Sequence, residues 1–204
     1  MGFYSQLIFP RLCDFLLKRP FVAKHRRELL AHVHGQVLEI GFGTGLNLPH
    51  YPTQAQRITT VDPNPGMNAL AQQRIRRSKI EVDQRALSGE RLPFADNTFD
   101  CAVSTFTLCS IEDVRQALSE VYRVLKPGGK FLFLEHGLSP ESSVQKWQRR
   151  LNWLEIRLGD GCHLDRDIKA LVAAQPFSSL EVKAFYLQEM PKTHGYLYRG
   201  IGRK

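Results

Sequence analysis

The sequence predicts an α/β fold in which a doubly wound, Rossmann-like sheet of seven mostly parallel strands carries helices on both faces. Three observations lead to this prediction: strand-like and helix-like segments alternate from Gln36 onward, a glycine-rich turn follows the first strand, and an acidic residue ends the second. The chain has 204 residues, 43% of them apolar, which suffices for one substantial core but not for two comfortable domains. We therefore expect one domain over residues 1–204, with a helical N-terminal segment at 1–34 and an α/β core at 36–204.

The N-terminal segment is predicted to be helical, basic and amphipathic, although Pro10 must break or kink it. Five apolar residues can share one side of this helix: Phe3, Leu7, Leu12, Phe15 and Leu16. A second helical stretch follows Pro20, and three charged residues in it are expected to be exposed: Arg26, Arg27 and Glu28. Neither a membrane-spanning run of roughly 20 apolar residues nor a signal peptide is indicated. We expect the segment to act as a lid over a ligand site, with membrane contact secondary.

The alternating part of the chain begins with five predicted strands: Gln36–Ile40, Arg57–Val61, Lys79–Asp83, Thr98–Ser104 and Lys130–Leu134. The predicted helices are Met67–Arg77, Ile111–Leu125 and Ser142–Leu158. The second of these has the clearest helical spacing, and Lys126-Pro127-Gly128-Gly129 ends it because proline and two glycines cannot continue a helix. Strands near Leu180–Tyr186 and Tyr196–Gly202 would complete the sheet.

The cysteine content and the net charge place only weak limits on the cellular compartment and the partners of the protein. The four cysteines form no Cys-x-x-Cys pair, so we expect neither a disulfide framework nor a structural zinc site, and no metal. A reducing cytoplasm is the simpler setting. The net charge of +8 is compatible with an acidic partner, whether membrane phospholipid, nucleic acid or an anionic substrate, and equally with a solvated basic surface.

The central motif, Glu39-Ile40-Gly41-Phe42-Gly43-Thr44-Gly45, directly follows the first predicted strand. Glycines here permit a tight turn and close approach of a ligand to the backbone. A nicotinamide-binding fingerprint would place its third glycine where this chain has Leu46. Pro49 and Pro52 leave room for only a short helix, which is poorly suited to holding a pyrophosphate.

An acidic residue at the end of the second strand completes the motif. Asp62 follows Gly45 by 17 residues, where a carboxylate can accept hydrogen bonds from ribose hydroxyls. S-adenosylmethionine has a ribose, a sulfonium cation and no phosphate, so the acidic Glu39 is compatible with it. The pattern therefore predicts an S-adenosylmethionine site, with S-adenosylhomocysteine as product, formed by Glu39, Gly41, Gly43, Gly45 and Asp62.

These motifs resemble those of class I S-adenosylmethionine-dependent methyltransferases from Gln36 to about Leu134. The matching segments are Val37–Gly45, Val61–Met67, Leu92-Pro93-Phe94 with Phe99-Asp100, and Val121–Lys130. The resemblance implies methyltransferase activity and further cofactor contacts at Pro63, Met67, Ser88, Gly89, Glu90, Ser104 and Thr105. Many members have an aspartate where this chain has Ser88, so the adenine contact is expected from backbone groups.

A narrower resemblance covers almost the whole chain. Its segments are Leu108-Cys109-Ser110-Ile111, Leu134-Glu135-His136-Gly137, Trp147-Gln148 and Gly161-Cys162-His163-Leu164-Asp165-Arg166. They recur in a bacterial branch labelled phospholipid or ubiquinone-type methyltransferases, and they are similar to the animal membrane-associated alkyl thiol methyltransferases. The animal proteins have a hydrophobic N-terminal anchor, where this chain has a shorter amphipathic stretch.

The narrower resemblance implies a small, lipophilic acceptor, with thiol S-methylation the first choice. Phosphatidylethanolamine N-methylation and quinol C- or O-methylation stay open, as does, more remotely, a non-catalytic cofactor-binding protein. The expected location is cytoplasmic, with peripheral contact to an anionic membrane left open. The oligomeric state is not predicted.

Catalytic residues are harder to predict, because methyl transfer depends mainly on alignment and exclusion of water. His136, just after the fifth strand, is the predicted catalytic residue that takes the acceptor's proton; the alternative is a histidine that hydrogen-bonds a loop. Glu135 either orients it or structures the turn, and His163 more simply serves a turn. Cys109 is expected to be packed and inert.

Three further alternatives are disfavoured. With Cys109 and Cys162 the cysteine set of arsenite methyltransferases is incomplete. Nucleic acid is not an expected partner, because Ser104-Thr105-Phe106-Thr107 stands where base-methylating enzymes have Asn/Asp-Pro-Pro-aromatic. Trp147 and Trp153 are expected in the core rather than in an acceptor pocket.

Overall fold

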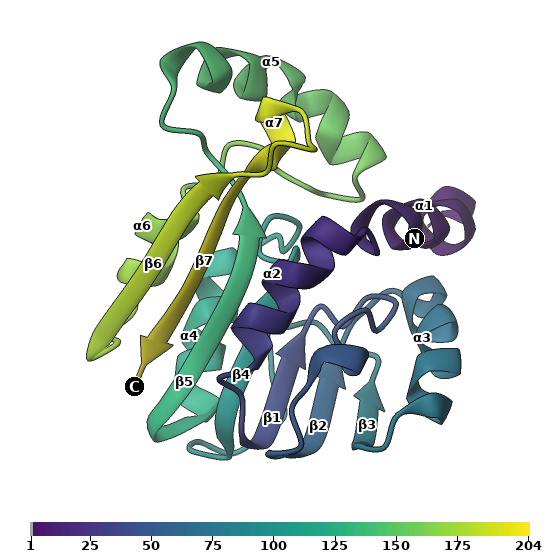
Figure 1. Ribbon diagram of the computed structural model, residues 1–204, viewed down its shortest axis with the longest axis vertical. Coiled ribbons are helices and arrows are strands. Elements are labelled where there is room, and N and C mark those ends of the chain that lie inside the picture. The colour runs from purple at the N-terminus through teal and green to yellow at the C-terminus, as the bar shows by residue number, and fades with distance from the viewer. Residues whose placement is uncertain (1) are drawn as a thin grey trace.

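The computed structural model describes residues 2–204, so Met1, the first residue of the predicted N-terminal segment, lies outside it. It contains a seven-stranded sheet with the strand order β3-β2-β1-β4-β5-β7-β6 (Figure 1). The strands are β1 Gly35–Ile40, β2 Ala55–Val61, β3 Glu81–Arg85, β4 Phe99–Thr105, β5 Leu125–His136, β6 Ser179–Tyr186 and β7 Tyr196–Arg203. The first five strands pair in parallel, and β7 runs antiparallel to both β5 and β6. The predicted fold class is confirmed.

Helices of three kinds surround the sheet. The α-helices are α1 Phe9–Leu17, α2 Pro20–Leu30, α3 Pro65–Arg77, α4 Val114–Val124, α5 Ser142–Leu158, α6 Ile168–Ala173 and α7 Lys192–Gly195. A π-helix, η1, covers Tyr4–Ile8, and a 3-10 helix, η2, covers Leu48–His50. Pro10 stands in the first turn of α1, so the predicted break is a change from π- to α-helix just before the proline.

Side chains alternate between the two faces of the sheet and so divide the core in two. One half joins Leu38, Ile40, Ala102, Phe131 and Phe133 to α4 and α6. The other half joins Val37, Cys101, Val103, Leu132 and Leu134 to α2 and α3. Because successive strand residues point to opposite faces, Glu39 shares a face with Val37 and must point toward α2. In Figure 1, α2 crosses in front of the sheet and α4 lies behind it.

Element boundaries differ from the prediction mainly around α4 and β5. The helix begins at Val114 rather than Ile111, and the strand begins at Leu125 rather than Lys130. The register with β4 shifts between Phe99 and Cys101, so Lys126-Pro127-Gly128-Gly129 is accommodated as an irregularity within a strand rather than as a loop. The bounds of α5 are those predicted, whereas α6 and α7 were not predicted.

Three predicted burial assignments are wrong. Arg26 is only 4% exposed, although Arg27 and Glu28 are exposed as expected. Trp147 and Trp153 are 56% and 62% exposed, because they lie on the outer side of α5 rather than in the core. The apolar side of the N-terminal helices also faces solvent: Phe3, Leu7, Leu12, Phe15 and Leu16 are all exposed.

The parallel strands direct their carboxyl ends to a single edge of the sheet. Figure 1 shows β1, β2, β3 and β5 pointing toward the edge where α1 and α5 lie. Open α/β sheets bind their ligands at this edge, where strand order reverses. Here the reversal lies between the parallel neighbours β1 and β4: β2 and β3 are added on one side of β1, whereas β4 and β5 are added on the other.

Candidate functional site

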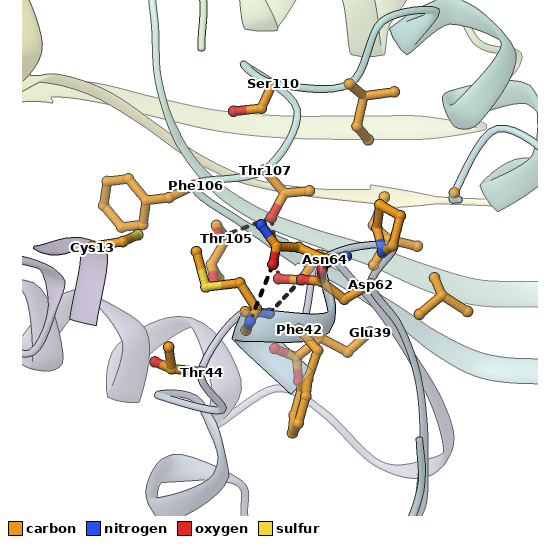
Figure 2. Close-up of a pocket in the computed structure, with 18 of the residues that line it drawn as sticks. Cys13, Glu39, Phe42, Thr44, Asp62, Asn64, Thr105, Phe106, Thr107 and Ser110 are labelled. Atoms are coloured by element: carbon orange, nitrogen blue, oxygen red, sulfur yellow. Dashed lines mark hydrogen bonds between the residues drawn. The ribbon is translucent and has the colours of Figure 1, made fainter. Parts of the chain in front are cut away.

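A cavity of about 430 Å³ lies at the carboxyl edge, which is large enough for a cofactor-sized ligand (Figure 2). The predicted cofactor residues that line it are Glu39, Gly41, Gly43, Asp62, Pro63, Met67, Ser88, Gly89, Glu90 and Thr105. Two predicted residues lie outside the lining. Gly45 supports the turn, with φ +80° and the Phe42 ring 3.3 Å from where its Cβ would lie. Ser104 is fully buried and donates to Glu135 Oε1 at 2.7 Å.

Two glycines of the loop have positive φ angles, and a side chain would meet a close neighbour at Gly41 but open space at Gly43. Gly41 has φ +67°, and a Cβ there would fall on the side chain of Thr107. Gly43 has φ +56°, and the nearest atom to a Cβ there would be Gly41 O at 3.9 Å. A side chain at Gly43 would therefore project into unfilled space of the cavity, which is the space a ligand needs.

Asp62 fixes the shape of this loop from the end of β2. Its Oδ2 accepts a hydrogen bond from Gly43 N at 2.7 Å, and its Oδ1 accepts one from Asn64 N at 2.8 Å. Burial raises the pKa of the Asp62 carboxyl, and these two backbone donors partly offset that rise. Each carboxylate oxygen keeps a further lone pair, so Asp62 can both hold the loop and accept from a ligand.

Glu39 is buried at the end of β1 and is fully hydrogen-bonded. Its Oε1 accepts from Asn47 Nδ2 at 2.8 Å, and its Oε2 accepts from the Tyr51 hydroxyl at 2.7 Å. Burial raises the pKa of Glu39 to about 7, against the opposing effects of Tyr51, Asn47 and Arg26. Glu39 therefore titrates near neutrality beside the cavity.

Arg26 is a cavity residue that the sequence prediction missed. Its Nη1 donates to Asn47 Oδ1 at 2.7 Å and to Thr105 Oγ1 at 2.6 Å. Burial lowers the pKa of Arg26 to about 10, and Glu39 partly counters this. Its Nε is buried without a hydrogen-bond partner in the described part of the chain. The available signal was helical spacing, because Arg26 shares the buried side of α2 with Val22, Leu29 and Leu30.

The loop at Ser88-Gly89-Glu90 closes the cavity on the adenine side implied by the resemblance. Ser88 Oγ donates to Glu90 Oε2 at 3.1 Å and accepts from Glu90 N at 3.2 Å. Glu90 Oε1 in turn accepts from Asp113 N at 2.8 Å. Both side chains are thus engaged within the protein, which leaves the backbone of this loop to contact a ligand.

The N-terminal helices form one wall of the cavity through Phe9, Cys13 and Leu17. Between the last two, Asp14 faces the glycine loop. Asp14 Oδ1 accepts from Thr44 Oγ1 at 2.6 Å and pairs with Arg74 Nη1 at 2.8 Å. This ion pair ties α1 to α3 and to the loop at once.

The π-helix η1, which precedes α1, is held to the body of the protein at a second point. Asn64 Nδ2 donates to Ser5 O at 2.9 Å, and Ser5 Oγ donates to Asp160 Oδ2 at 2.8 Å. Gly66, in the first turn of α3, lies against η1, and a Cβ there would fall on the backbone carbonyl of Gln6. The N-terminal segment therefore sits on α3 at a point where only glycine leaves room.

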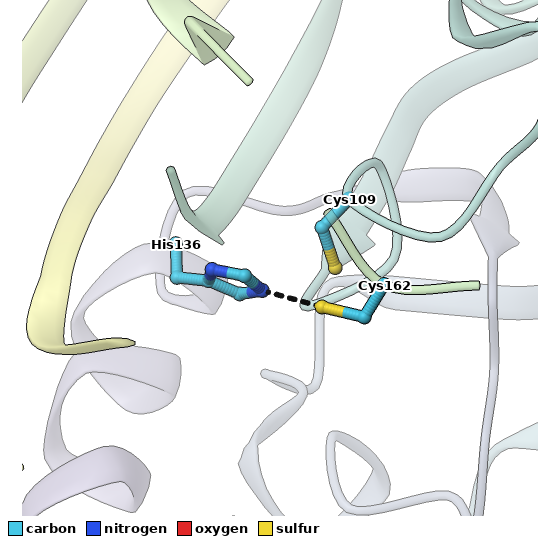
Figure 3. Close-up of side chains that lie close together, drawn as sticks. All are labelled: Cys109, His136 and Cys162. Carbon is cyan, nitrogen blue, oxygen red and sulfur yellow. Dashed lines mark hydrogen bonds between the residues drawn. The ribbon is translucent and has the colours of Figure 1, made fainter. Parts of the chain in front are cut away.

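His136 is not among the described residues that line the cavity. Its Nε2 lies 3.1 Å from Cys162 Sγ, with Cys109 beside both (Figure 3). A hydrogen bond from Cys162 lowers the pKa of Cys109 well below its usual value. Burial disfavours the charged form of His136, yet the nearby Cys109 thiolate raises the pKa of its imidazole. Proton removal from the acceptor by His136 stays a prediction.

Glu135 and His163 serve the surrounding loops. Glu135 points to the opposite face of β5 from His136, and its Oε2 accepts from Thr107 N at 2.8 Å, so it structures the turn. His163 N donates to Cys109 O at 2.9 Å, and its ring Nδ1 lies 3.4 Å from Asn152 Nδ2.

Comparison with known proteins identifies the family. A model of the methyltransferase domain matches residues 38–133. A thiol S-methyltransferase of Rattus norvegicus, TMT1B, is 33% identical over 195 residues, which cover 86% of this chain and 77% of the relative. A phosphatidylethanolamine N-methyltransferase of Cereibacter sphaeroides is 31% identical over 178 residues, covering 85% and 83%.

The fold is shared with solved structures at lower identity. A SAM-dependent methyltransferase of Thermotoga maritima superposes with a TM-score of 0.70 at 22% identity, and the match covers 98% of both chains. The relatives differ in the acceptors for which they are named but agree in the reaction. This chain belongs to the class I S-adenosylmethionine-dependent methyltransferases, and S-adenosylmethionine is its cofactor.

Proposed function

We propose that the protein transfers the methyl group of S-adenosylmethionine to the sulfur of a small, apolar thiol. The observation that carries this choice is the composition of the cavity wall: among the described lining residues there is no histidine, lysine or tyrosine. The two best-placed carboxylates, Glu39 and Asp62, already accept two hydrogen bonds each. Because a thiol ionises only about 1–2 pH units above neutrality, it needs less help from a base than an amine or an alcohol does.

We propose that S-adenosylmethionine occupies the part of the cavity formed by the glycine loop, Asp62 and Ser88–Glu90, whose acidic and basic side chains complement its charges. The cofactor supplies a methyl group activated by a positively charged sulfur. Asp62 is proposed to accept from the ribose hydroxyls, and the backbone of Ser88–Glu90 to contact the adenine. Arg26, with its unpaired Nε, would hold the carboxylate of the amino acid portion, and Glu39 would lie on the side of the positive charges. The space in front of Gly43 admits the ligand.

The remaining predicted contacts belong to the same proposal. Pro63 and Met67 lie in the lining after β2, and Thr105 lies in it at the end of β4, where it is already bonded to Arg26. The apolar part of the wall comes mainly from Phe9, Leu17, Phe106 and Ile111. An apolar acceptor would find its binding energy there, with α1 as a lid that excludes water.

A lipophilic acceptor also accounts for the exposed hydrophobic side chains on the outer surface of the protein. Among the described residues, every large hydrophobic side chain that is exposed lies on the N-terminal helices or α5: Phe3, Leu7, Ile8, Leu12, Phe15, Leu16, Trp147, Trp153, Leu154, Ile156 and Leu158. The same helices expose basic residues: Arg11, Lys18, Arg19, Lys146, Arg149, Arg150 and Arg157. The Tyr4 hydroxyl donates to Leu158 O at 2.7 Å, so the two elements meet.

We propose that this apolar and basic surface rests on an anionic membrane, from which an acceptor partitions into the cavity. No helix among residues 2–204 is long and apolar enough to cross a bilayer. Membrane contact would also suit the second candidate, phosphatidylethanolamine N-methylation, for which one relative is named. Quinol methylation is the third candidate, and the acceptor test below includes all three.

Asp62→Ala should weaken S-adenosylhomocysteine binding by tenfold or more, because an acceptor for the ribose hydroxyls is lost and two loop amides lose their partner, at about 1–3 kcal/mol. Isothermal titration calorimetry measures this directly. Asp83→Ala is the matched control, since Asp83 lies in the adjacent strand β3 outside the lining. Equal affinity in wild type and Asp62→Ala would contradict the assignment.

Gly66→Ala tests the lid without truncation. Alanine suits a helix better than glycine, so α3 should remain folded, while the new methyl group must displace the Gln6 carbonyl and with it the N-terminal segment. We expect turnover to fall several-fold while S-adenosylhomocysteine affinity stays within about twofold. Deleting residues 2–18 should have the same effect. Wild-type turnover in both variants would leave the segment as a packing element alone.

A homologous series of alkane thiols tests the acceptor. If the apolar wall binds the chain, kcat/KM should rise about fourfold per added methylene until the cavity is filled, because each buried CH₂ contributes about 0.8 kcal/mol. Alcohols and amines of equal length are the matched controls and should not react. Radiolabelled methyl transfer to phosphatidylethanolamine vesicles or quinols, with none to thiols, would favour the other candidates.

The membrane surface is tested by neutralising two charges on α5. Arg149→Ala with Arg150→Ala should weaken co-sedimentation with phosphatidylglycerol vesicles roughly thirtyfold, since each basic residue near an anionic surface contributes about 1 kcal/mol. The control pair, Arg76→Ala with Arg77→Ala, removes two exposed charges from the end of α3 and should have little effect. An equal loss in both pairs would indicate a general charge effect and contradict the proposed surface.

A further inference from the structure

Three side chains that are far apart in the sequence converge beside the cavity. Cys109 follows β4, His136 ends β5 and Cys162 follows α5, and their ligand-type atoms all lie within 4.8 Å of one another (Figure 3). Cys109 is 2% exposed, and His136 and Cys162 are each 8% exposed. In Figure 3 the imidazole and the two sulfur atoms point toward a common centre.

The segments that carry these residues are bonded to one another, so the cluster is preorganised. His163 N donates to Cys109 O at 2.9 Å, and Leu138 N donates to Arg166 O at 2.9 Å. The Arg166 guanidinium donates to Ile111 O at 2.6 Å. Each of the three segments is thus tied to another through its backbone, independently of the three side chains.

The donor set and its spacing match those of a thiophilic cation. Zinc binds thiolate sulfur at about 2.3 Å and imidazole nitrogen at about 2.0–2.1 Å, so in a tetrahedral site the ligand atoms lie about 3.4–3.8 Å apart. The distance of 3.1 Å between His136 Nε2 and Cys162 Sγ and the outer limit of 4.8 Å bracket that range. Small side-chain rotations would bring the three atoms onto one ion.

Charge and hydrogen bonding favour an ion at this point. Two buried thiolates and a dication sum to zero charge, which removes the cost of burying an unpaired thiolate. His136 Nδ1 is buried and has no hydrogen-bond partner in the described part of the chain. A neutral imidazole that binds an ion through Nε2 carries its proton on Nδ1, so this tautomer leaves Nε2, the nitrogen nearest Cys162 Sγ, free to bind the ion.

We propose that Cys109, His136 and Cys162 bind a thiophilic divalent cation and leave its fourth position open to the sulfur of the acceptor. Two cysteines and a histidine with an open position form a known kind of catalytic zinc site. Thr107, Ser110 and Asp160, which are chain neighbours of the two cysteines, line the cavity. The second half of this proposal rests on the proposed thiol acceptor, whereas the ion site itself does not.

The chemistry balances without any oxidant. When the acceptor's sulfur binds the ion, its S–H proton leaves to solvent. A lone pair of that sulfur forms the new S–CH₃ bond as the bond from the methyl group to the cofactor's sulfonium breaks. The neutral thioether is a weaker ligand than a thiolate, so the next thiol displaces it. His136 is then an ion ligand rather than a base for the acceptor.

Cobalt substitution tests the ion site. The reduced, metal-free full-length protein is titrated with Co²⁺, and sulfur-to-cobalt charge-transfer absorption should saturate at one equivalent. Cys109→Ser and Cys162→Ser should each lose most of this absorption, and His136→Gln should weaken Co²⁺ binding at least tenfold. Cys101→Ala is the matched control, because Cys101 is another buried cysteine, in the middle of β4, and should bind as wild type does.

Wild-type protein alone can overturn the ion site, so the test does not depend on the folding of any variant. Absence of sulfur-to-cobalt absorption overturns it, as does absorption that persists in both serine variants. Recovery of the wild type with Cys109 and Cys162 joined as a disulfide that the reductant does not open, and that therefore cannot bind Co²⁺, also overturns it.

The open position is tested by adding an alkane thiol to the cobalt-loaded protein without cofactor. A new sulfur-to-cobalt band is expected, whereas the alcohol of equal length should leave the spectrum unchanged. A spectrum unaffected by thiols that the enzyme does methylate would overturn the open position. If no thiol is methylated but Co²⁺ still binds through both cysteines, the proposed acceptor fails while the ion site stands.

Discussion

The buried hydrogen-bond network that links Arg26 to Glu39 through Asn47 is the interaction on which the rest of the site depends. A guanidinium and a carboxylate removed from water are stable only if each finds partners, and here Asn47, Thr105 and Tyr51 supply them. This network joins α2, β1, β4 and the segment after the glycine loop. Replacing one charged partner would leave the other buried and uncompensated, so the pair fixes the loop, the helix and the strand ends as a unit. The same network places one basic and one acidic side chain in the wall of the cavity.

Most of the residues that line the cavity were predictable from sequence because their placement depends on local rules. Strand alternation and the carboxyl-edge rule bring Glu39 and Asp62 together from residues that are close in the chain. Arg26 was missed because charge alone suggested solvent, although its spacing with Val22 and Leu30 indicated the buried side of α2. Trp147 was assigned to the core on the average behaviour of tryptophan, which says nothing about a helix whose outer face is apolar.

The acceptor side was less predictable for a different reason. It is built from segments far apart in sequence, and their meeting depends on long-range packing. Cys109 and Cys162 were paired only as an incomplete arsenite-type set, and His136 was considered separately. No ligand spacing links the three, since His136 and Cys162 alone are 26 residues apart. This division agrees with the comparisons, in which relatives named for a thiol and for a phospholipid acceptor share one cofactor-binding fold.

The manner in which the N-terminal helices are fastened has a consequence for the catalytic cycle. Their apolar side faces outward, and they are held to the body of the protein largely by polar contacts, above all Asp14 to Thr44 and Arg74, and Ser5 to Asn64 and Asp160. These contacts lie outside both halves of the core, so the helices can move without disturbing either half. A cofactor in the cavity would lie against Phe9, Cys13 and Leu17 of these helices, so its entry and release would require the helices to move. A surface that draws the outward apolar side away from the protein, as a bilayer does, would then act on the rate as well as on the location of the enzyme.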